Sequence, residues 1–169
     1  MTKYLSKRIL AALALAILLA GPTPSLAANG RLDQLAARIS KAMTAELGFP
    51  SDPSFYEDTV RYGHNFDTAR DFPAKTFIPS LSAKQPMLRQ LMPDAKVTIT
   101  REVASGDTIV LISELNGTLP DGAAYHSKTA TFFTIENNRI RGMDVWMDLA
   151  DGMKLLKYMR ENGGAVPPK

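Results

Sequence analysis

The sequence predicts an α+β fold in which helices of the N-terminal half pack on a mainly antiparallel sheet formed later in the chain. Residues 29–47 carry apolar side chains at intervals of three and four, a spacing typical of an amphipathic helix. Residues 96–148 contain four strand-like segments joined by tight-turn sequences, which predicts a meander of antiparallel strands. The sequence has no internal repeat and no pattern that indicates a second domain.

The first 27 residues are typical of a cleaved signal peptide. Lys3, Lys7 and Arg8 precede the apolar segment 9–20, which is shorter than the ~20 residues needed to span a bilayer. Small and helix-breaking residues follow, and we expect cleavage after Ala27. An uncleaved membrane anchor is the alternative. Cleavage would leave the mature protein secreted or periplasmic, without a stable membrane anchor.

Charge and composition exclude several classes of function. The chain has 20 Lys and Arg and 17 Asp and Glu, and three of the basic residues lie in the predicted signal peptide, so the mature chain is formally neutral. A neutral chain without a basic cluster is not expected to bind nucleic acid. The absence of Cys excludes thiol chemistry and Cys-based zinc sites. Two His without a clustered carboxylate pair give no metal-ligand spacing, and we expect no cofactor.

Four elements are expected before the meander: a helix over 29–47, a short helix over 54–60, a strand over 61–66 and a helix over 83–92. The first helix should end at Gly48 and Pro50. Asp52 followed by Pro53 is typical of a helix N-terminus. Ser82 is a candidate N-cap for the later helix. Pro73 and Pro79 argue against any long element between these segments.

The strands of the meander differ in how far their side chains should be buried. Apolar and polar side chains alternate along residues 96–103, with Val97, Ile99 and Val103 on one face that should be buried. Residues 108–115 are apolar at nearly every position, which predicts a central strand covered on both faces. A final helix over 152–162 follows. The predicted organisation is a signal peptide over 1–27, one domain over 28–162 and a flexible tail over 163–169.

Three segments resemble proteins of the SnoaL-like and nuclear transport factor 2-like superfamily. They are FYEDTV from residue 55, LMPDAKVTITREVASGDTIV from residue 91 and IENNRIRGMDVWMDL from residue 135. The resemblance implies that the sheet is curved and forms a cone-shaped pocket, and that the N-terminal helices pack on it. Some proteins of this group use the pocket for chemistry, including polyketide cyclases.

The closing strands are also similar to limonene-epoxide hydrolase, whose chemistry requires an Asp-Arg-Asp arrangement. In this sequence Ile112 stands at the Arg position, Glu114 at the first Asp and Val145 at the second. In the steroid-isomerase branch a buried acidic donor lies in the strand that reads TATFF here, without an ionisable group. The resemblance therefore implies the fold and a pocket, but not epoxide hydrolysis.

The pocket should be largely apolar. We expect it to be lined by Tyr62, Val110, Ile112, Glu114, Met143, Val145 and Met147. Glu114 shares a strand face with Val110 and Ile112, and a carboxyl group in such a pocket can act as a general acid or base. The alternative is a carboxylate at the solvent rim or paired with Lys or Arg.

His64 is the second candidate for acid–base chemistry. It follows Tyr62 in a strand that should line the pocket, where it can form hydrogen bonds or transfer a proton, and the alternative is a surface or structural histidine. His126 should face away from the pocket. On the last strand, Asp144 and Trp146 share one face and Met143 and Val145 the other.

The face that carries Trp146 indicates a subunit interface, and we expect a homodimer through it unless the C-terminal helix covers this side chain. For function, the sequence leaves three hypotheses. The first is an exported module that binds a small hydrophobic molecule, and the second is a small lyase, cyclase or isomerase that uses Glu114 with His64 or Tyr62. An interaction protein that binds through Trp146 is the third. The first two differ in whether Glu114 and His64 point into one cavity.

Overall fold

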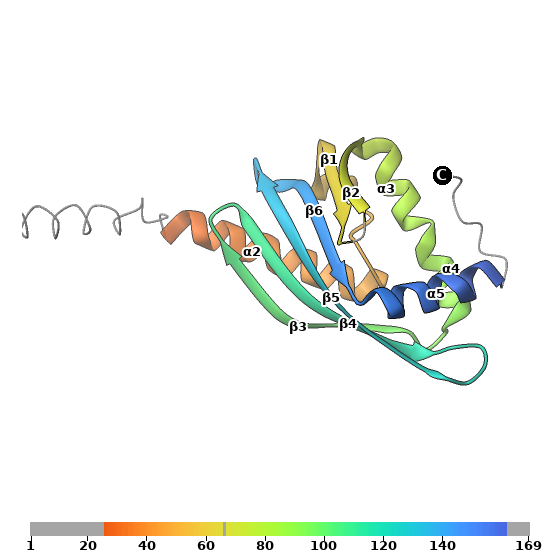
Figure 1. The fold of residues 1–169 in the computed structure, drawn as a ribbon. Helices are drawn as coiled ribbons and strands as arrows, with labels where there is room; N and C mark the ends of the chain where they lie inside the picture. The colour runs from red at the N-terminus through yellow and green to blue at the C-terminus, as the bar shows by residue number, and fades with distance from the viewer. Residues whose placement is uncertain (1–25, 66, 162–169) are drawn as a thin grey trace, which may run out of the picture.

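The computed structural model describes residues 26–65 and 67–161, and its core is a six-stranded mixed sheet with the strand order β2-β1-β6-β5-β4-β3 (Figure 1). In chain order the elements are α2 (Leu26–Glu46), the 3-10 turn η1 (Pro53–Phe55), β1 (Tyr56–His64), β2 (Asp67–Pro73), α3 (Ala74–Ser82), α4 (Lys84–Leu91), β3 (Lys96–Ser105), β4 (Thr108–Thr118), β5 (Ala124–Glu136), β6 (Arg139–Met147) and α5 (Leu149–Glu161). The α+β prediction is confirmed. The predicted signal peptide, apart from its last two residues, and the tail lie outside the described residues.

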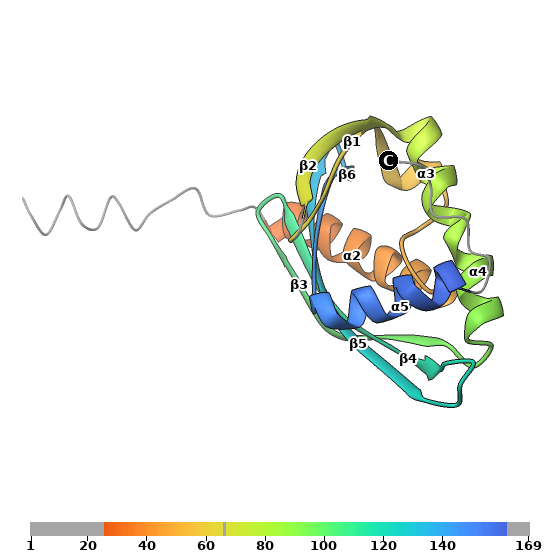
Figure 2. The same ribbon diagram turned by 45° about the vertical axis from the view of Figure 1, so that its right-hand side comes forward.

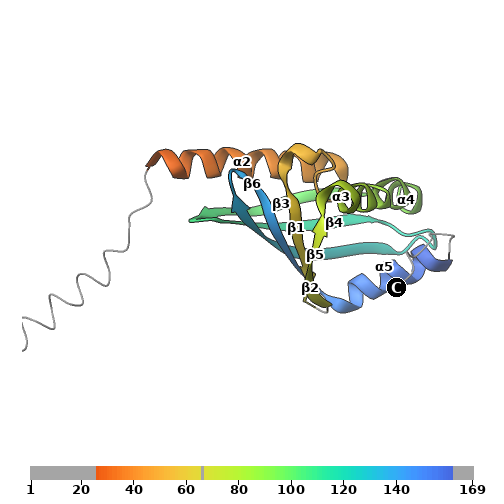
Figure 3. The same ribbon diagram turned by 90° about the horizontal axis from the view of Figure 1, so that it is seen from above.

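The sheet curves around the helices, which lie on its concave side (Figures 2 and 3). Helix α2 crosses this side, and α3, α4 and α5 lie beside it toward the end at which the β4–β5 hairpin projects. The strands β3 to β6 form the predicted antiparallel meander, whereas β1 pairs with β6 in parallel. No helix in the described part of the chain is long and apolar enough to cross a membrane.

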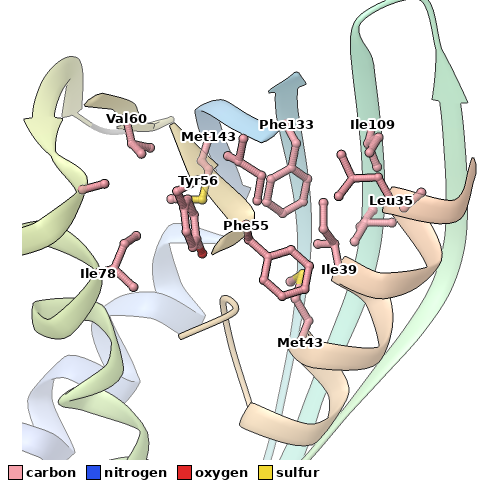
Figure 4. Close-up of a cluster of buried hydrophobic side chains, with 14 of the residues drawn as sticks. Leu35, Ile39, Met43, Phe55, Tyr56, Val60, Ile78, Ile109, Phe133 and Met143 are labelled. Carbon is pink, nitrogen blue, oxygen red and sulfur yellow. The ribbon is translucent and has the colours of Figure 1, made fainter. Parts of the chain in front are cut away.

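The main hydrophobic core lies between α2 and the sheet (Figure 4). Leu35 and Ile39 point from α2 toward Phe133 on β5, and all three side chains are almost completely buried. The regularly spaced apolar residues of α2 therefore form the buried face of an amphipathic helix, as the sequence predicted. Ser40 of α2 also donates a hydrogen bond to Glu102 of β3, which holds the helix to the edge of the sheet.

The short helix predicted over residues 54–60 is wrong. Asp52 caps only the 3-10 turn, where its carboxylate accepts a hydrogen bond of 2.8 Å from the backbone N–H of Ser54. The chain then enters β1, and Tyr56 and Val60 are buried in the core. Strand pairing on both sides of β1 and the burial of these β-favouring side chains outweigh the capping signal.

Two elements occur where the sequence showed no clear pattern. Pro73 ends β2, an edge strand where a missing N–H is tolerated, and Pro79 lies inside α3. The prediction that Ser82 caps α4 is also wrong. Its hydroxyl donates to the carbonyl oxygen of Ile78 at 3.0 Å, and Ala83 occupies the N-cap position.

Two features of the meander differ from the prediction. A bulge between Ile99 and Arg101 shifts the register of β3, so Val103 turns to the outer face of the sheet and is 49% exposed. Strand β4 is covered on one face only within the described residues, because Ile109 is buried under α2 whereas Val110 on the opposite face is half-buried. The last of the predicted tight turns is confirmed, because Asn137 and its neighbour Asn138 have positive φ, a conformation that Asn tolerates.

Candidate functional site

The concave face of the sheet carries two separate hydrophobic clusters. The first fills the space between α2, α3 and the sheet. The second lies between α4 and the end of the sheet that carries the β4–β5 hairpin, and α5 packs against this second cluster. Four buried residues of the concave face belong to neither cluster: Ser113, Ser127, Thr131 and Val145. A zone with three hydroxyl groups therefore separates the two apolar clusters, and it is the candidate site.

Strand pairing defines how this zone is built. Thr131 of β5 lies opposite Val145 of β6, and Val145 lies beside His64 of β1. In the next row, Ser113 of β4 lies opposite Thr129 of β5. Side chains that pair directly across strands point to the same face. The hydroxyl groups and the imidazole therefore face the same concave interior.

Tyr62 and His64 form a hydrogen-bonded pair at the β1 side of this zone. The phenolic oxygen of Tyr62 lies within hydrogen-bond reach of Nε2 of His64, and the two rings meet edge to face with centroids 4.8 Å apart. Phe49 and Phe77 pack around the Tyr62 ring at centroid distances of 6.2 and 4.9 Å. This aromatic packing fixes the direction in which the phenol points.

Burial determines the protonation state of both groups. It raises the pKa of Tyr62 far above its ordinary value, so the phenol keeps its proton at neutral pH. Burial also lowers the pKa of His64, and the positive charge of Lys84 at the start of α4 lowers it further, while Asp67 opposes these effects. His64 is therefore a neutral imidazole at pH 7, and a neutral imidazole can accept a proton.

Thr131 is the most deeply buried polar side chain of the zone. It is completely buried, and its Oγ1 has no hydrogen-bond partner among the described residues. A buried hydroxyl of this kind costs stability unless another group satisfies it. Thr131 is not among the residues predicted for the site, because the prediction for the segment TATFF rests on its lack of an ionisable group. The sequence does contain a signal for this residue. Alternation along the strand places the polar Thr131 on the same face as the apolar Phe133.

The seven residues predicted for one pocket lie on two faces of the sheet. Tyr62, Met143 and Val145 are on the concave face. Met147 is on the same face, because it lies two residues after Val145 on β6. The other three predicted residues, Val110, Ile112 and Glu114, lie on the outer face. The prediction that all seven line one pocket is wrong. The physical reason is the strand register. Ile112 lies opposite Ala130, and Ala130 lies opposite Trp146, so all three side chains are on the face where Trp146 is exposed.

Glu114 and His64 do not meet in one cavity. The Glu114 carboxylate lies on the outer face, where it is 3.6 Å from the Nζ of Lys128, its partner on β5. The alternative of a carboxylate paired with a Lys is thus the one observed. His126 also lies on the outer face, as expected, with its Nδ1 2.8 Å from Oδ1 of Asn116. Among the described residues no cluster of His, Asp and Glu could hold a metal ion.

The outer face carries an exposed aromatic side chain next to a shallow hollow. Trp146 is 56% exposed, so the alternative that α5 covers it is wrong, since α5 packs on the concave side through Leu155 and Met159. The hollow has a volume of about 350 Å³ and is lined by Asn65, Ile112, Lys128, Ala130, Trp146 and Met147.

Comparison with known proteins identifies the fold. No protein-family profile and no curated protein match the sequence. A protein provisionally assigned as a SnoaL-like polyketide cyclase, from Jannaschia sp. CCS1, superposes with a TM-score of 0.59 at 18% identity over 87% of this chain and all of its own. An NTF2-like protein of unknown function from Cytophaga hutchinsonii gives 0.57 at 12% identity, over 69% of this chain and 99% of its own.

An epoxide hydrolase of M. tuberculosis that is similar to limonene-epoxide hydrolase gives a TM-score of 0.56 at 15% identity, over 78% of this chain and 94% of its own. At these identities the likeness concerns the backbone arrangement alone. The chain therefore has the nuclear transport factor 2-like fold that its closing strands resemble, with the SnoaL-like polyketide cyclases among its structural neighbours.

Proposed function

We propose that the chain binds a small, largely apolar molecule with a polar group, in the concave interior between the two hydrophobic clusters. The observation that supports this most directly is the zone of buried hydroxyl groups beside the Tyr62–His64 pair. Apolar side chains on both sides of this zone would hold the body of the ligand. The hydroxyl of Thr131, which has no partner among the described residues, offers a ligand a group with which it can form a hydrogen bond.

The polar groups define what the ligand must offer. The Thr131 hydroxyl can donate to a carbonyl or hydroxyl oxygen, and the Tyr62–His64 pair can donate or accept a hydrogen bond, according to the tautomer of the imidazole. Among the charges that act on His64, the positive charge of Lys84 has a larger effect on its pKa than the negative charge of Asp67, and this balance favours a ligand with partial negative charge at this end. A largely apolar molecule with a carbonyl or enol group fits these requirements.

Native mass spectrometry of the purified protein tests this proposal, with titration of the fluorescent probe 8-anilino-1-naphthalenesulfonate (ANS) as a second measurement. We expect a retained ligand or saturable ANS binding that is lost when Ser113→Phe fills the interior. Trp146→Glu is the matched control, because ANS bound at the outer face would be lost in that variant instead. Probe binding that Ser113→Phe leaves unchanged and Trp146→Glu abolishes contradicts the proposal.

A second candidate function is acid–base catalysis, as in a lyase, cyclase or isomerase. His64 supports it, because a half-buried neutral imidazole can take a proton from carbon. The positive charge of Lys84, which lowers the pKa of this imidazole, would favour the anion that forms. Glu114 takes no part in this version. Deuterium incorporation into cyclohexanone in D₂O, followed by NMR, is the measurement. Exchange that the protein accelerates and His64→Gln abolishes would support catalysis, and equal rates with and without the protein would contradict it.

We also propose that the protein is exported, on the basis of the sequence of residues 1–27. N-terminal sequencing of protein recovered from outside the cytoplasm should begin at Ala28. Recovery of the chain only with residues 1–27 retained would contradict this proposal.

A further inference from the structure

The residues of β5 that face the concave interior carry hydroxyl groups at alternate positions. Tyr125, Ser127, Thr129 and Thr131 follow one another at intervals of two, and the pairing of β5 with β4 is regular over this stretch, so all four side chains share one face. Tyr125 and Ser127 are both almost completely buried, each with 4% of its surface exposed. The polar zone of the candidate site therefore follows one strand, from Thr131 toward α5.

The hydrogen bonds of Tyr125 determine what Ser127 can offer to a ligand. The phenol of Tyr125 donates its only proton to the backbone carbonyl oxygen of Asp151 in α5, at 3.2 Å, because a carbonyl oxygen can only accept. The phenolic oxygen is then left as an acceptor for the neighbouring Ser127 hydroxyl. Burial raises the pKa of Tyr125, and the contact with Ser127 opposes this rise, as a hydrogen bond donated to the phenolic oxygen does. Ser127 thus uses its single proton on Tyr125, and only its lone pairs remain for another molecule.

Thr131 offers the opposite capacity at the other end of the polar zone. Its hydroxyl has no hydrogen-bond partner among the described residues, so it can donate its proton to an acceptor. Thr131 and Ser127 are four residues apart on β5, which is about 13 Å along a strand. With a hydrogen bond of about 2.8 Å at each end, the two polar groups of a molecule that lies along β5 are about 8 Å apart.

We propose that the interior selects a ligand with two polar groups of opposite hydrogen-bonding character: a carbonyl oxygen that accepts from Thr131, and a hydroxyl or N–H group that donates to Ser127. This inference rests on the proposed ligand site and adds the polarity and length of its ligand. The carbonyl end lies in the row of His64, and the donor end lies beside Tyr125. An ether or a second carbonyl group at the Ser127 end would place two acceptors opposite each other, which is unfavourable in a buried site.

Isothermal titration calorimetry with three rigid ketones tests the proposal. The compound 6-acetyl-2-naphthol has a ketone and a hydroxyl group at opposite ends of its ring system, 6-acetyl-2-methoxynaphthalene has an ether oxygen in place of the hydroxyl, and 2-acetylnaphthalene has only the ketone. The naphthol should bind more tightly than 2-acetylnaphthalene by roughly twofold to tenfold, because it gains one hydrogen bond. Ser127→Ala should abolish this difference. Ser105→Ala, the same change at the exposed end of β3, should retain it.

Tyr125→Phe is the decisive variant, because it changes the character of Ser127. Without the phenolic oxygen, the Ser127 hydroxyl can donate its proton to an ether oxygen. The methoxy compound should therefore bind to this variant more tightly than to the original protein, by roughly twofold to tenfold, while 2-acetylnaphthalene binds equally to both. Tyr56→Phe is the matched control, because this buried phenol also donates to a backbone carbonyl oxygen, that of Pro50, but lies in the first hydrophobic cluster. It should leave the order of the three affinities unchanged.

The outcomes distinguish the polarity of the ligand from the site on which it rests. If the ketones bind and Ser113→Phe prevents their binding, but the naphthol and 2-acetylnaphthalene bind equally, the site stands and the polarity is overturned. A methoxy compound that gains no affinity in Tyr125→Phe also overturns the polarity. If none of the three ketones binds, both the site and its polarity are overturned. Far-UV circular dichroism of each variant shows that its fold is retained.

Discussion

Replacement of Thr131 by Val should stabilise the protein in the absence of a ligand. Thr131 is completely buried, and its hydroxyl has no hydrogen-bond partner among the described residues. Val has nearly the same shape but carries a methyl group in place of the hydroxyl, so it removes the cost of leaving a buried polar group unsatisfied. That cost is about 1–3 kcal/mol. For a domain of this size, 1 kcal/mol changes the melting temperature by about 3 °C, so the expected rise is roughly 3–9 °C.

Thermal unfolding followed by circular dichroism measures this rise. Thr134→Val is the matched control, because Thr134 lies on the same strand but is exposed on the outer face, where the change should shift the melting temperature by less than about 2 °C. The same Thr131→Val change should weaken the binding of a retained ligand or of ANS. A ligand group that used the hydroxyl would lose a hydrogen bond, which is worth about 0.5–1.5 kcal/mol.

Thr131→Val should raise the melting temperature and weaken ligand binding, and these opposite signs make the test specific. A residue kept for packing alone should lose stability, or keep it, without any change in binding. If Thr131→Val lowers the melting temperature, the hydroxyl contributes to folding, and the reasoning from its missing partner is refuted. If stability rises while probe binding is unchanged, the hydroxyl does not contact the probe, and its role in the proposed site is refuted.

Three further changes test other parts of the structure. Phe133→Ala, at the centre of the core, should lower the free energy of unfolding by about 3–5 kcal/mol in urea denaturation. Glu114→Gln should cost no more than about 1 kcal/mol and leave ANS binding in the interior unchanged, because its ion pair with Lys128 lies on the outer face. The lowered pKa of His64 means that the unfolded chain takes up a proton near pH 6.5 while the folded chain does not, so stability should fall as pH falls below about 6.5. This part of the pH dependence should be absent in His64→Gln, and an unchanged dependence would contradict the assignment.

Turn chemistry and periodicity predicted the parts of the fold that depend on local sequence. The helix at the start of the domain and the four strands of the meander are such parts, since each has an internal pattern that repeats over many residues. The first part of β1, residues 56–60, is predicted as a helix because the local signal at Asp52 is a real cap. This cap stabilises only a single turn. The next segment is extended because it pairs with β2 and β6, and both of these strands lie later in the chain.

The bulge in β3 shows a second limit of sequence reasoning. Alternation places Val97, Ile99 and Val103 on one face, and one additional residue in the strand moves Val103 to the other. Because side chains alternate with a period of two, a single such insertion reverses every later position in the strand. The sequence between Ile99 and Val103 contains no Gly or Pro to indicate the bulge.

The misplacement of the predicted pocket has the same origin at the level of the whole sheet. Alternation correctly grouped Val110 with Ile112 and Glu114 on one strand, and Met143 with Val145 on another. It could not determine whether the two groups share a face, because that depends on the pairing of β5 with both strands. Adjacent residues of β5 show the two faces: Thr131 is buried on the concave side, and the next residue, Phe132, is exposed on the outer face. The central strands of this sheet therefore present side chains to both faces, and a role can be assigned to one of these side chains only after its face is known.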